Sequence, residues 1–454
     1  MARSHRTLVV VLLLLVLAGL AGSAVFWGYR EAGRTPAELL DLVGRRMEGF
    51  TRVEWLGMAV AGRAKHPFVV PPPPPRRGPG EVAAFDPTPQ GVRVWRVGPQ
   101  GPLLRIADAA RLAKDGDVVE IEAGDYRGDV AVWNQSKLTI RGINGAARLY
   151  ADGQSAEGKA IWVIRNGQFD IANIDFVGAS VSDGNGAGIR FEGGDLRLRH
   201  CLFWGNQFGL LTSGAGQAAS ARLTIESSEF AYSQVRGRWG HNLYVGTIDT
   251  LTVTASYFHH ADTGHLLKSR ARINHVLYNR FTDESGGRAS YELNFPNGGF
   301  VRMVGNVVHQ QADTENATMV SYGEEGYRWP DNQLLMGSNT LVNDYPQGGT
   351  FVYAAKGARR VVSANNLLIG AGAWRVSDAV VTVNESRARS AVLTRPLRDD
   401  YGVAAASAAL AFRKPEGMDW AALLEPNAYY VHPLAVRALN RAPRWAGAHP
   451  GEPE

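Results

Sequence analysis

The sequence predicts an all-β protein whose body is a single-stranded parallel β-helix, a solenoid that begins with a short capping helix. Three observations predict this fold. A short alternating strand that ends in a large apolar residue recurs at a spacing of roughly 27 residues, which lies in the range of solenoid repeats. A small polar residue, often asparagine, recurs two positions before that apolar residue. No helical pattern separates the copies.

The copies of the strand can be aligned on their last residue. Alternation with a period of two is typical of a strand that buries one face. Because one turn of a solenoid cannot bury its apolar face alone, we expect the last residues to stack as a column inside the body. The predicted column is Phe176, Phe203, Phe230, Phe258, Phe281, Val308, Leu341 and Leu368.

A second column is predicted two positions earlier. Stacked asparagines can hydrogen-bond to one another through their amide groups and tolerate turn geometry, so we expect a ladder at a corner of the solenoid. The column is Cys201, Ser228, Ser256, Asn279, Asn306, Asn339 and Asn366. Cys201 is the only cysteine, which excludes an internal disulfide and a cysteine-cluster metal site, and we interpret it as a buried small hydrophobe.

The N-terminal region, residues 1–29, is predicted to be a membrane anchor or a signal peptide. Residues 8–29 are almost wholly apolar and follow Arg3, His5 and Arg6, which is typical of a transmembrane helix with a cytoplasmic N-terminus. Small residues at 21–24 offer a cleavage site as the alternative. Because the apolar run continues beyond them, we favour an inner-membrane protein with its body in the periplasm, or a secreted protein if the segment is cleaved.

Residues 30–90 are interpreted as an amphipathic helix followed by a spacer. Thr35 and Pro36 form a good helix start, with Glu38 three residues after the cap, and apolar residues at helical spacing follow to about Phe50. A proline run at 71–75 is expected to be extended and to hold the body off the membrane. Residues 91–375 would form the β-helix, and 376–454 an extension that packs on it.

The start of the body carries a resemblance to a known family. Residues 106–113 read as a short helix, and the segment AARLAKDGDVVEIEAGDY at 109–126 leads into the repeats. This opening resembles that of pectate-lyase-like right-handed parallel β-helix proteins, over about residues 92–372. The resemblance implies a right-handed β-helix, and it leaves the activity open, since this scaffold carries lyases, hydrolases, epimerases and inert adhesins.

The composition limits the partners. The 454 residues include 52 glycines and carry a formal net charge of +5. This mild basic excess suits an acidic polymer or an anionic membrane surface, and it is too weak and dispersed to indicate nucleic acid. We expect a monomer.

A candidate functional face lies within residues 240–299. Three similar strands there align on Leu243, Leu267 and Leu293. If these leucines point inward, the residues on either side point outward. One predicted outward row is Asn242, Leu266 and Glu292, and the next is Tyr244, Lys268 and Asn294.

The ionisable groups on this face suit elimination at a uronate sugar. That reaction needs a cation for the carboxylate, a base for the neighbouring proton and an acid for the leaving oxygen. Lys268 and Arg270 supply cations, Tyr244 would act with them as acid or base, and His265 is a proton carrier. Further residues are expected to contact the sugar: Arg238, His241, Asn242, Glu292, Asn294, Tyr322 and Glu324.

The Lys-Ser-Arg stretch at Lys268 also resembles the region of the catalytic lysine in alginate and chondroitin lyases of this fold. The resemblance implies that Lys268 is the base. It does not extend to the arginine on the family's next turn, where this chain has Glu292, Leu293 and Asn294. It does not extend to the two acidic calcium ligands either, whose places hold Ala261 and Thr263.

Four alternatives stay open. Glu292 and Glu324 would suit a glycoside hydrolase if they lie at a suitable separation. The same carboxylates, with Asn242 and Asn294, would suit a calcium ion, although no cofactor is required by the sequence. The body would otherwise serve as a non-catalytic module that binds or guides an acidic polysaccharide. A C5-epimerase would share the first proton abstraction with a lyase.

Overall fold

The computed structural model describes residues 68–85, 87–213, 220–235, 239–312, 314–378, 380–388, 393–395, 400–403 and 410–449. The chain divides into a unit of residues 1–67 and a unit of residues 68–454. The predicted anchor and amphipathic helix, and also Arg238, therefore lie outside the described residues. Within the described ranges, no helix is long and apolar enough to cross a membrane.

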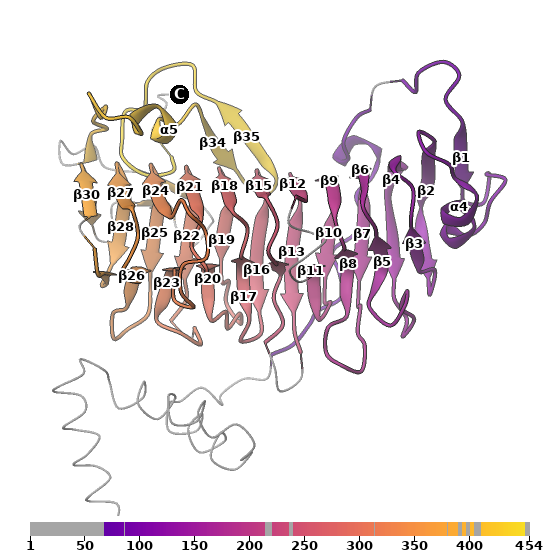
Figure 1. The fold of residues 1–454 in the computed structure, drawn as a ribbon, viewed down its shortest axis with the longest axis horizontal. Helices are drawn as coiled ribbons and strands as arrows, with labels where there is room; N and C mark the ends of the chain where they lie inside the picture. Colours follow the sequence, from indigo (N-terminus) through magenta and orange to yellow (C-terminus); the bar gives the residue numbers. More distant parts are fainter. Residues whose placement is uncertain are drawn as a thin grey trace, which may run out of the picture. The chain divides into compact units, whose positions relative to one another are not determined.

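The body is a right-handed parallel β-helix in which a typical turn contributes three strands (Figure 1). One strand of each turn joins a ten-stranded parallel sheet, which we call sheet B. Its strands are β3 (Ala131–Trp133), β5 (Ala160–Ile164), β8 (Ala187–Phe191), β11 (Phe208–Thr212), β14 (Leu243–Val245), β17 (His265–Ser269), β20 (Tyr291–Phe295), β23 (Thr318–Tyr322), β26 (Thr350–Ala354) and β29 (Ala373–Val376).

The other two strands of each turn form the two flanks of a 21-stranded sheet. The flanks count as one sheet because β2 (Val118–Arg127) and β4 (Lys137–Tyr150) run through the corner between them. Flank A1 continues with β1 (Val94–Val97), β6 (Gly167–Ala172), β9 (Gly194–Arg199), β12 (Arg222–Glu226), β15 (Thr250–Thr254), β18 (Ile273–Leu277), β21 (Phe300–Val304), β24 (Gln333–Gly337), β27 (Arg360–Ala364) and β30 (Val380–Val383). Flank A2 continues with β7 (Ile174–Val177), β10 (Leu202–Trp204), β13 (Glu229–Ser233), β16 (Tyr257–Ala261), β19 (Arg280–Thr282), β22 (Val307–Gln310), β25 (Thr340–Asn343), β28 (Leu367–Gly370) and β31 (Ser386–Ala388).

The predicted apolar column is confirmed in full. Its members are register partners from turn to turn, and all are buried. The five phenylalanine rings are stacked, with successive ring centroids 4.4–5.0 Å apart. Such contacts add stabilisation beyond the burial of apolar area, which helps to fix the register of each turn on the next.

The predicted polar ladder is confirmed as well. The side-chain amide of Asn279 donates to Asn306 at 3.1 Å, Asn306 to Asn339 at 2.9 Å, and Asn339 to Asn366 at 2.9 Å. Each amide also donates to a backbone carbonyl of an earlier turn. Cys201 lies buried at the start of this column, where burial raises the pKa of its thiol to about 12, as expected for an inert residue.

The first turn of the solenoid is capped by a helix, and the outer sides of later turns are covered by the C-terminal extension. Helix α4 (Ile106–Leu112) packs on the first turn, and the Asp129 carboxylate accepts hydrogen bonds from the amides of Ile106 and Ala107. This helix shields a sheet edge that would otherwise be open. The C-terminal extension packs on the outside of the last turns. It contains β32 (Leu393–Arg395), β33 (Asp400–Val403), α5 (Ala421–Leu424), β34 (Ala428–Val431) and β35 (Ala435–Ala438).

The proline run at 71–75 is docked on the body and is not a free spacer. The indole of Trp204 donates to the carbonyl of Pro71 at 2.9 Å, and Arg148 donates to the carbonyl of Pro74 at 2.8 Å. A short 3-10 helix, η2 (Pro79–Glu81), follows on the same path. Proline has no amide hydrogen to satisfy but keeps its carbonyl acceptor, so an extended proline segment can lie on polar groups of a sheet.

Candidate functional site

The outer row predicted around Lys268 exists on sheet B. Leu243, Leu267 and Leu293 are register partners in the core, and Tyr244, Lys268 and Asn294 form the neighbouring register row. Tyr244 and Lys268 are partly exposed in this row, whereas Asn294, predicted to face outward, is fully buried. This row continues to Ser321 on β23. The sequence alignment of these strands is therefore confirmed residue by residue.

Lys268 and Arg270 hold a carboxylate on this surface. The guanidinium of Arg270 binds the carboxylate of Glu325 through two hydrogen bonds of 2.6 and 2.9 Å, and the ammonium of Lys268 approaches the same carboxylate at 3.3 Å. The side chains of Arg270 and Lys268 are only 16% and 14% exposed, respectively, whereas that of Glu325 is 40% exposed. The pKa of Glu325 is lowered by these two cations against the opposing effect of burial.

Tyr244 and Asn297 orient the guanidinium. The Nε–H of Arg270 donates to the Tyr244 hydroxyl at 3.1 Å, and one Nη donates to the Asn297 side chain at 2.5 Å. Lys268 and Arg270 also lie 5.5 and 5.8 Å from the centroid of the Tyr244 ring. The half-buried tyrosine therefore contacts both cations through its ring and its hydroxyl.

Glu324 and Glu325 sit in a tight turn at residues 323–326, which we call the acidic turn. Gly323 and Gly326 have φ values of 75° and 88°, a backbone region that favours glycine. The amide of Glu325 donates to the carbonyl of Pro296 on the previous turn at 2.9 Å. Glu324 is held separately, because its carboxylate accepts hydrogen bonds of 2.6 Å from Asn294 and Ser321.

His241 and His265 belong to an aromatic stack beside these cations. The two imidazole centroids are 4.5 Å apart, and His265 also packs against Tyr291 at 4.9 Å. The backbone amide of His265 donates to Nδ1 of His241 at 2.8 Å, so that nitrogen is an acceptor. Burial, together with the charges of Lys268 and Arg270, lowers the pKa of His241 well below its ordinary value, which keeps this ring neutral.

The predicted outward row of Asn242, Leu266 and Glu292 is wrong. All three side chains are fully buried. The row lies where the chain turns the corner into sheet B, so the side chains on both sides of the bend point inward and the strict alternation of a strand fails. Asn242 fills the corner, where its amide donates to the carbonyls of Phe230 and His259.

Glu292 is consequently a buried acid rather than a sugar ligand. Its carboxylate accepts a hydrogen bond of 3.4 Å from Gln310. Burial and the neighbouring charge of Asp283 raise the pKa of Glu292 well above its ordinary value, which favours the protonated form of this carboxyl group. Because Glu292 is buried, it cannot form with Glu324 the pair of accessible carboxyl groups that the hydrolase alternative requires.

Tyr322 is also turned away from the predicted surface. It is fully buried, and its hydroxyl donates to the carbonyl of Gly299 at 2.7 Å. Tyr322 falls on the inward position of β23, in register with Phe295, so its side chain joins the core. Conversely, Glu325 and Asn297 contact Arg270 although neither was predicted to contact the sugar. The glycine-flanked Glu-Glu pair and the Pro-Asn-Gly turn were the available sequence signals.

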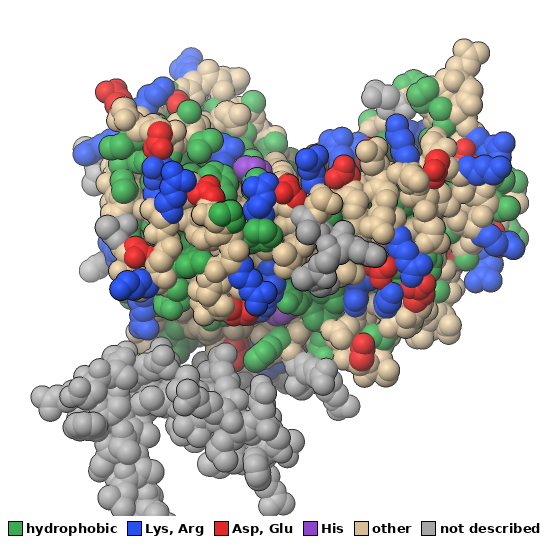
Figure 2. Space-filling model, viewed as in Figure 1, with side chains coloured by type: hydrophobic (Ala, Val, Ile, Leu, Met, Phe, Trp, Pro, Cys, Tyr) green, Lys and Arg blue, Asp and Glu red, His purple; other side chains and the backbone are tan. Residues whose placement is uncertain are grey.

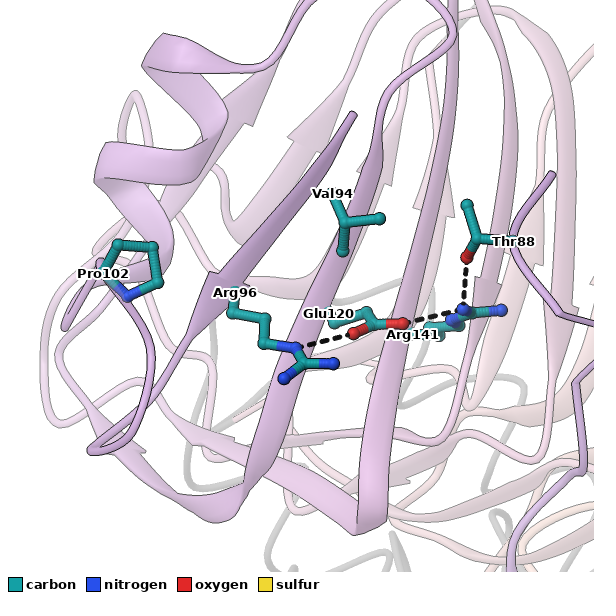
Figure 3. A pocket seen from close by; sticks show the side chains of 6 residues that line it. All are labelled: Thr88, Val94, Arg96, Pro102, Glu120 and Arg141. Carbon is teal, nitrogen blue, oxygen red and sulfur yellow. Dashed lines mark hydrogen bonds and ion pairs between the residues drawn. The ribbon is translucent and has the colours of Figure 1, made fainter. Parts of the chain in front are cut away.

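A second concavity lies on flank A1 (Figure 3). The Glu120 carboxylate lies between Arg96 and Arg141, at 3.1 and 2.7 Å, and Arg141 also donates to Thr88 at 2.7 Å. These contacts fasten the segment before β1 to the first turns. Basic and acidic side chains are interspersed over the face seen in Figure 2 rather than gathered by sign.

The described residues offer no cluster of three or more His, Cys, Asp or Glu that could hold a metal ion. The calcium alternative stays a prediction. Its proposed neutral ligand Asn242 is occupied at the corner, and Asn294 is bound to Glu324.

Comparison with known proteins gives a distant likeness to solved structures. No protein-family model and no curated protein matches the chain. Among solved structures, the crystal structure of pectate lyase Pel9A is similar, with 12% sequence identity, a TM-score of 0.47, and coverage of 79% of this chain and 97% of that chain. The strand pairing of the chain itself establishes the expected parallel β-helix.

Proposed function

We propose that the outer face of sheet B binds the carboxylates of an acidic, uronate-containing polysaccharide and cleaves the polymer by β-elimination. One observation carries the proposal: Lys268 and Arg270 already bind a carboxylate, that of Glu325, through a two-pronged contact. Planar guanidinium groups recognise carboxylates in this manner. In the complex, a uronate carboxylate takes the place of Glu325.

The roles of the three central residues follow from this exchange. Arg270 neutralises the uronate carboxylate and so acidifies the proton on the adjacent carbon. Lys268, as the free amine, accepts that proton, and the C–H electrons form the new carbon–carbon double bond. The glycosidic C–O bond breaks, and its oxygen takes a proton from the Tyr244 hydroxyl. The hydrogen bond from Arg270 to that hydroxyl supports its role as the acid.

The surroundings also support a sugar polymer. Trp239, two residues before His241, is 49% exposed, and an exposed indole offers a face for a sugar ring. The location is part of the proposal: residues 1–29 anchor the protein in the inner membrane, and the body lies in the periplasm.

A specific observation favours a second candidate, a module that binds the polysaccharide without cutting it. Both cations are largely covered and already paired with the Glu325 carboxylate in this structure. A site closed in this way would bind a polymer by displacement of the acidic turn and needs no further chemistry. The hydrolase alternative has less support because Glu292 is buried.

The test follows the ultraviolet absorbance of unsaturated uronate while the full chain is incubated with a panel of uronate polysaccharides. We expect wild type to produce the signal and Lys268→Ala to lose it, because the base is gone. Glu325→Gln should raise activity at low substrate by several-fold, since the competing carboxylate is removed. Lys137→Ala, an exposed lysine on flank A1, is the matched control and should leave activity unchanged.

Other outcomes would redirect the assignment. Full activity in Lys268→Ala would exclude Lys268 as the base. Reducing ends without unsaturated product would establish a hydrolase. Binding of a polymer without any change in its length would establish the binding module.

A further inference from the structure

Arg190 occupies the same outer row of sheet B as Tyr244 and Lys268. On β8 it is the register partner of Leu211, which pairs with Tyr244, which pairs with Lys268. Three strand spacings therefore separate Arg190 from Lys268, a distance of about 14 Å along the solenoid.

The surroundings of Arg190 are apolar. Its register neighbours on either side are Val163 and Leu211, which belong to a cluster of buried hydrophobic residues on this face, together with Phe208. The half-buried guanidinium donates one hydrogen bond of 3.1 Å to the carbonyl of Asn185, while its buried Nε has no hydrogen-bond partner. Burial lowers the pKa of Arg190 from its ordinary value.

Arg190 makes no ion pair, unlike Arg270 and Arg165, although Glu192 and Asp183 lie close enough to act on its charge. Arg270 is paired with Glu325, and Arg165 is paired with Glu157 and Glu192. No carboxylate of the described residues lies within ion-pair distance of Arg190. Desolvation of Arg190 outweighs the attraction of these two acids, and a partly desolvated cation that makes no direct ion pair is costly for the fold. Such groups gather at functional sites.

We propose that Arg190 binds a second carboxylate of the uronate polymer, several sugar units away from the carboxylate held by Lys268 and Arg270. This inference rests on the proposed function and deepens it. A guanidinium fork matches a carboxylate, and the apolar side chains around it exclude water and strengthen the contact. Because both subsites share one row, the polymer lies along the solenoid axis. A ligand of one or two sugars reaches only one of them.

The experiment measures binding as a function of ligand length. The Tyr244→Phe chain is the background, because it lacks the proposed acid and does not consume the ligand. Its affinity for oligogalacturonates and alginate oligomers of graded length is compared with that of the same chain carrying Arg190→Gln. We expect Arg190→Gln to lower the affinity for the longer oligomers about tenfold and to leave the affinity for the shortest ones unchanged. Arg197→Gln, on the outer surface of flank A1, serves as the matched control.

The outcomes separate the two proposals. If the Tyr244→Phe chain binds no uronate of any length, the proposed function falls and this inference falls with it. If that chain binds but Arg190→Gln has the same affinity at every length, only the subsite is overturned. An equal loss of affinity at all oligomer lengths would also overturn the subsite, since a remote subsite contributes only to the binding of long ligands. Arg190→Lys retains the charge and should recover part of the loss.

Discussion

Glu292 places an ionisable carboxyl group where water does not reach. Its neutral form is favoured in the folded protein because Asp283 and the surrounding core oppose a negative charge. In the unfolded chain the same group ionises at its ordinary pKa. The folded state therefore binds the proton more tightly, and its stability depends on pH.

The sign follows from the raised pKa. The stabilising contribution of Glu292 is fully present below the unfolded pKa and is lost as the pH rises through the folded value. We expect the wild type to lose stability as the pH rises from the unfolded pKa of Glu292 toward its raised folded pKa, by about 1.4 kcal/mol for each pH unit in between. Glu292→Gln should flatten this loss, as measured by urea unfolding across the range. Glu416 is exposed, so the stability of Glu416→Gln should depend on pH as that of the wild type does. A parallel decline in Glu292→Gln would contradict the assignment.

The same residue shows where sequence reasoning reached its limit. The alignment of Leu243, Leu267 and Leu293 was correct, and so was the outward position of Lys268. Glu292 was misplaced because the corner before each strand of sheet B breaks the alternation. A corner is set by the preceding strand, so the local pattern of a single strand does not reveal it.

The polar ladder is the element that the sequence defined most fully. Asn279, Asn306, Asn339 and Asn366 fall at equivalent positions of consecutive turns and form a continuous hydrogen-bonded column. Their spacing in the chain was sufficient evidence, because a solenoid places equivalent positions one above another. The acidic turn had no such repeat, so its contact with Arg270 required the three-dimensional structure.

Removal of one rung of the ladder should be costly. Asn306 is fully buried and makes hydrogen bonds both to Asn279 and to Asn339. Asn306→Ala removes the acceptor of the backbone and side-chain N–H groups of Asn279 and the donor to the carbonyl of Val276, and we expect a loss of about 3 kcal/mol in the free energy of unfolding. Urea unfolding measures it, with Thr252→Ala on the outer surface of flank A1 as the control, for which the expected change is within about 0.5 kcal/mol. A loss in Asn306→Ala no larger than the control's would show that the ladder does not stabilise the fold.

At the scale of the molecule, the segment before the first strand fastens several turns together. Its residues contact Arg148 on β4, Asp175 on β7 and Trp204 on β10. This arrangement was not predicted, because a proline run was interpreted from its stiffness alone. Its contacts depend on side chains that follow it by many residues in the sequence.

The proposed location leads to a test on the whole chain. If residues 1–29 remain as an anchor, the full chain should appear in the membrane fraction and resist extraction by alkaline carbonate. A chain that lacks residues 1–29 is the control and should not appear in that fraction. Recovery of the full chain as a shortened soluble protein would establish cleavage instead.

The contact of Glu325 with Lys268 and Arg270 has a consequence for which ligands succeed. A carboxylate attached to the same chain faces its cations at a local concentration that dilution of the protein does not alter. An external anion therefore binds only the fraction of molecules in which the acidic turn has moved away, and its apparent affinity falls in proportion. The apparent affinity of a single uronate is lowered by the full factor, whereas a polymer presents many carboxylates to the site at once. Under the proposed function, the acidic turn would therefore favour the binding of long anionic chains over that of their fragments.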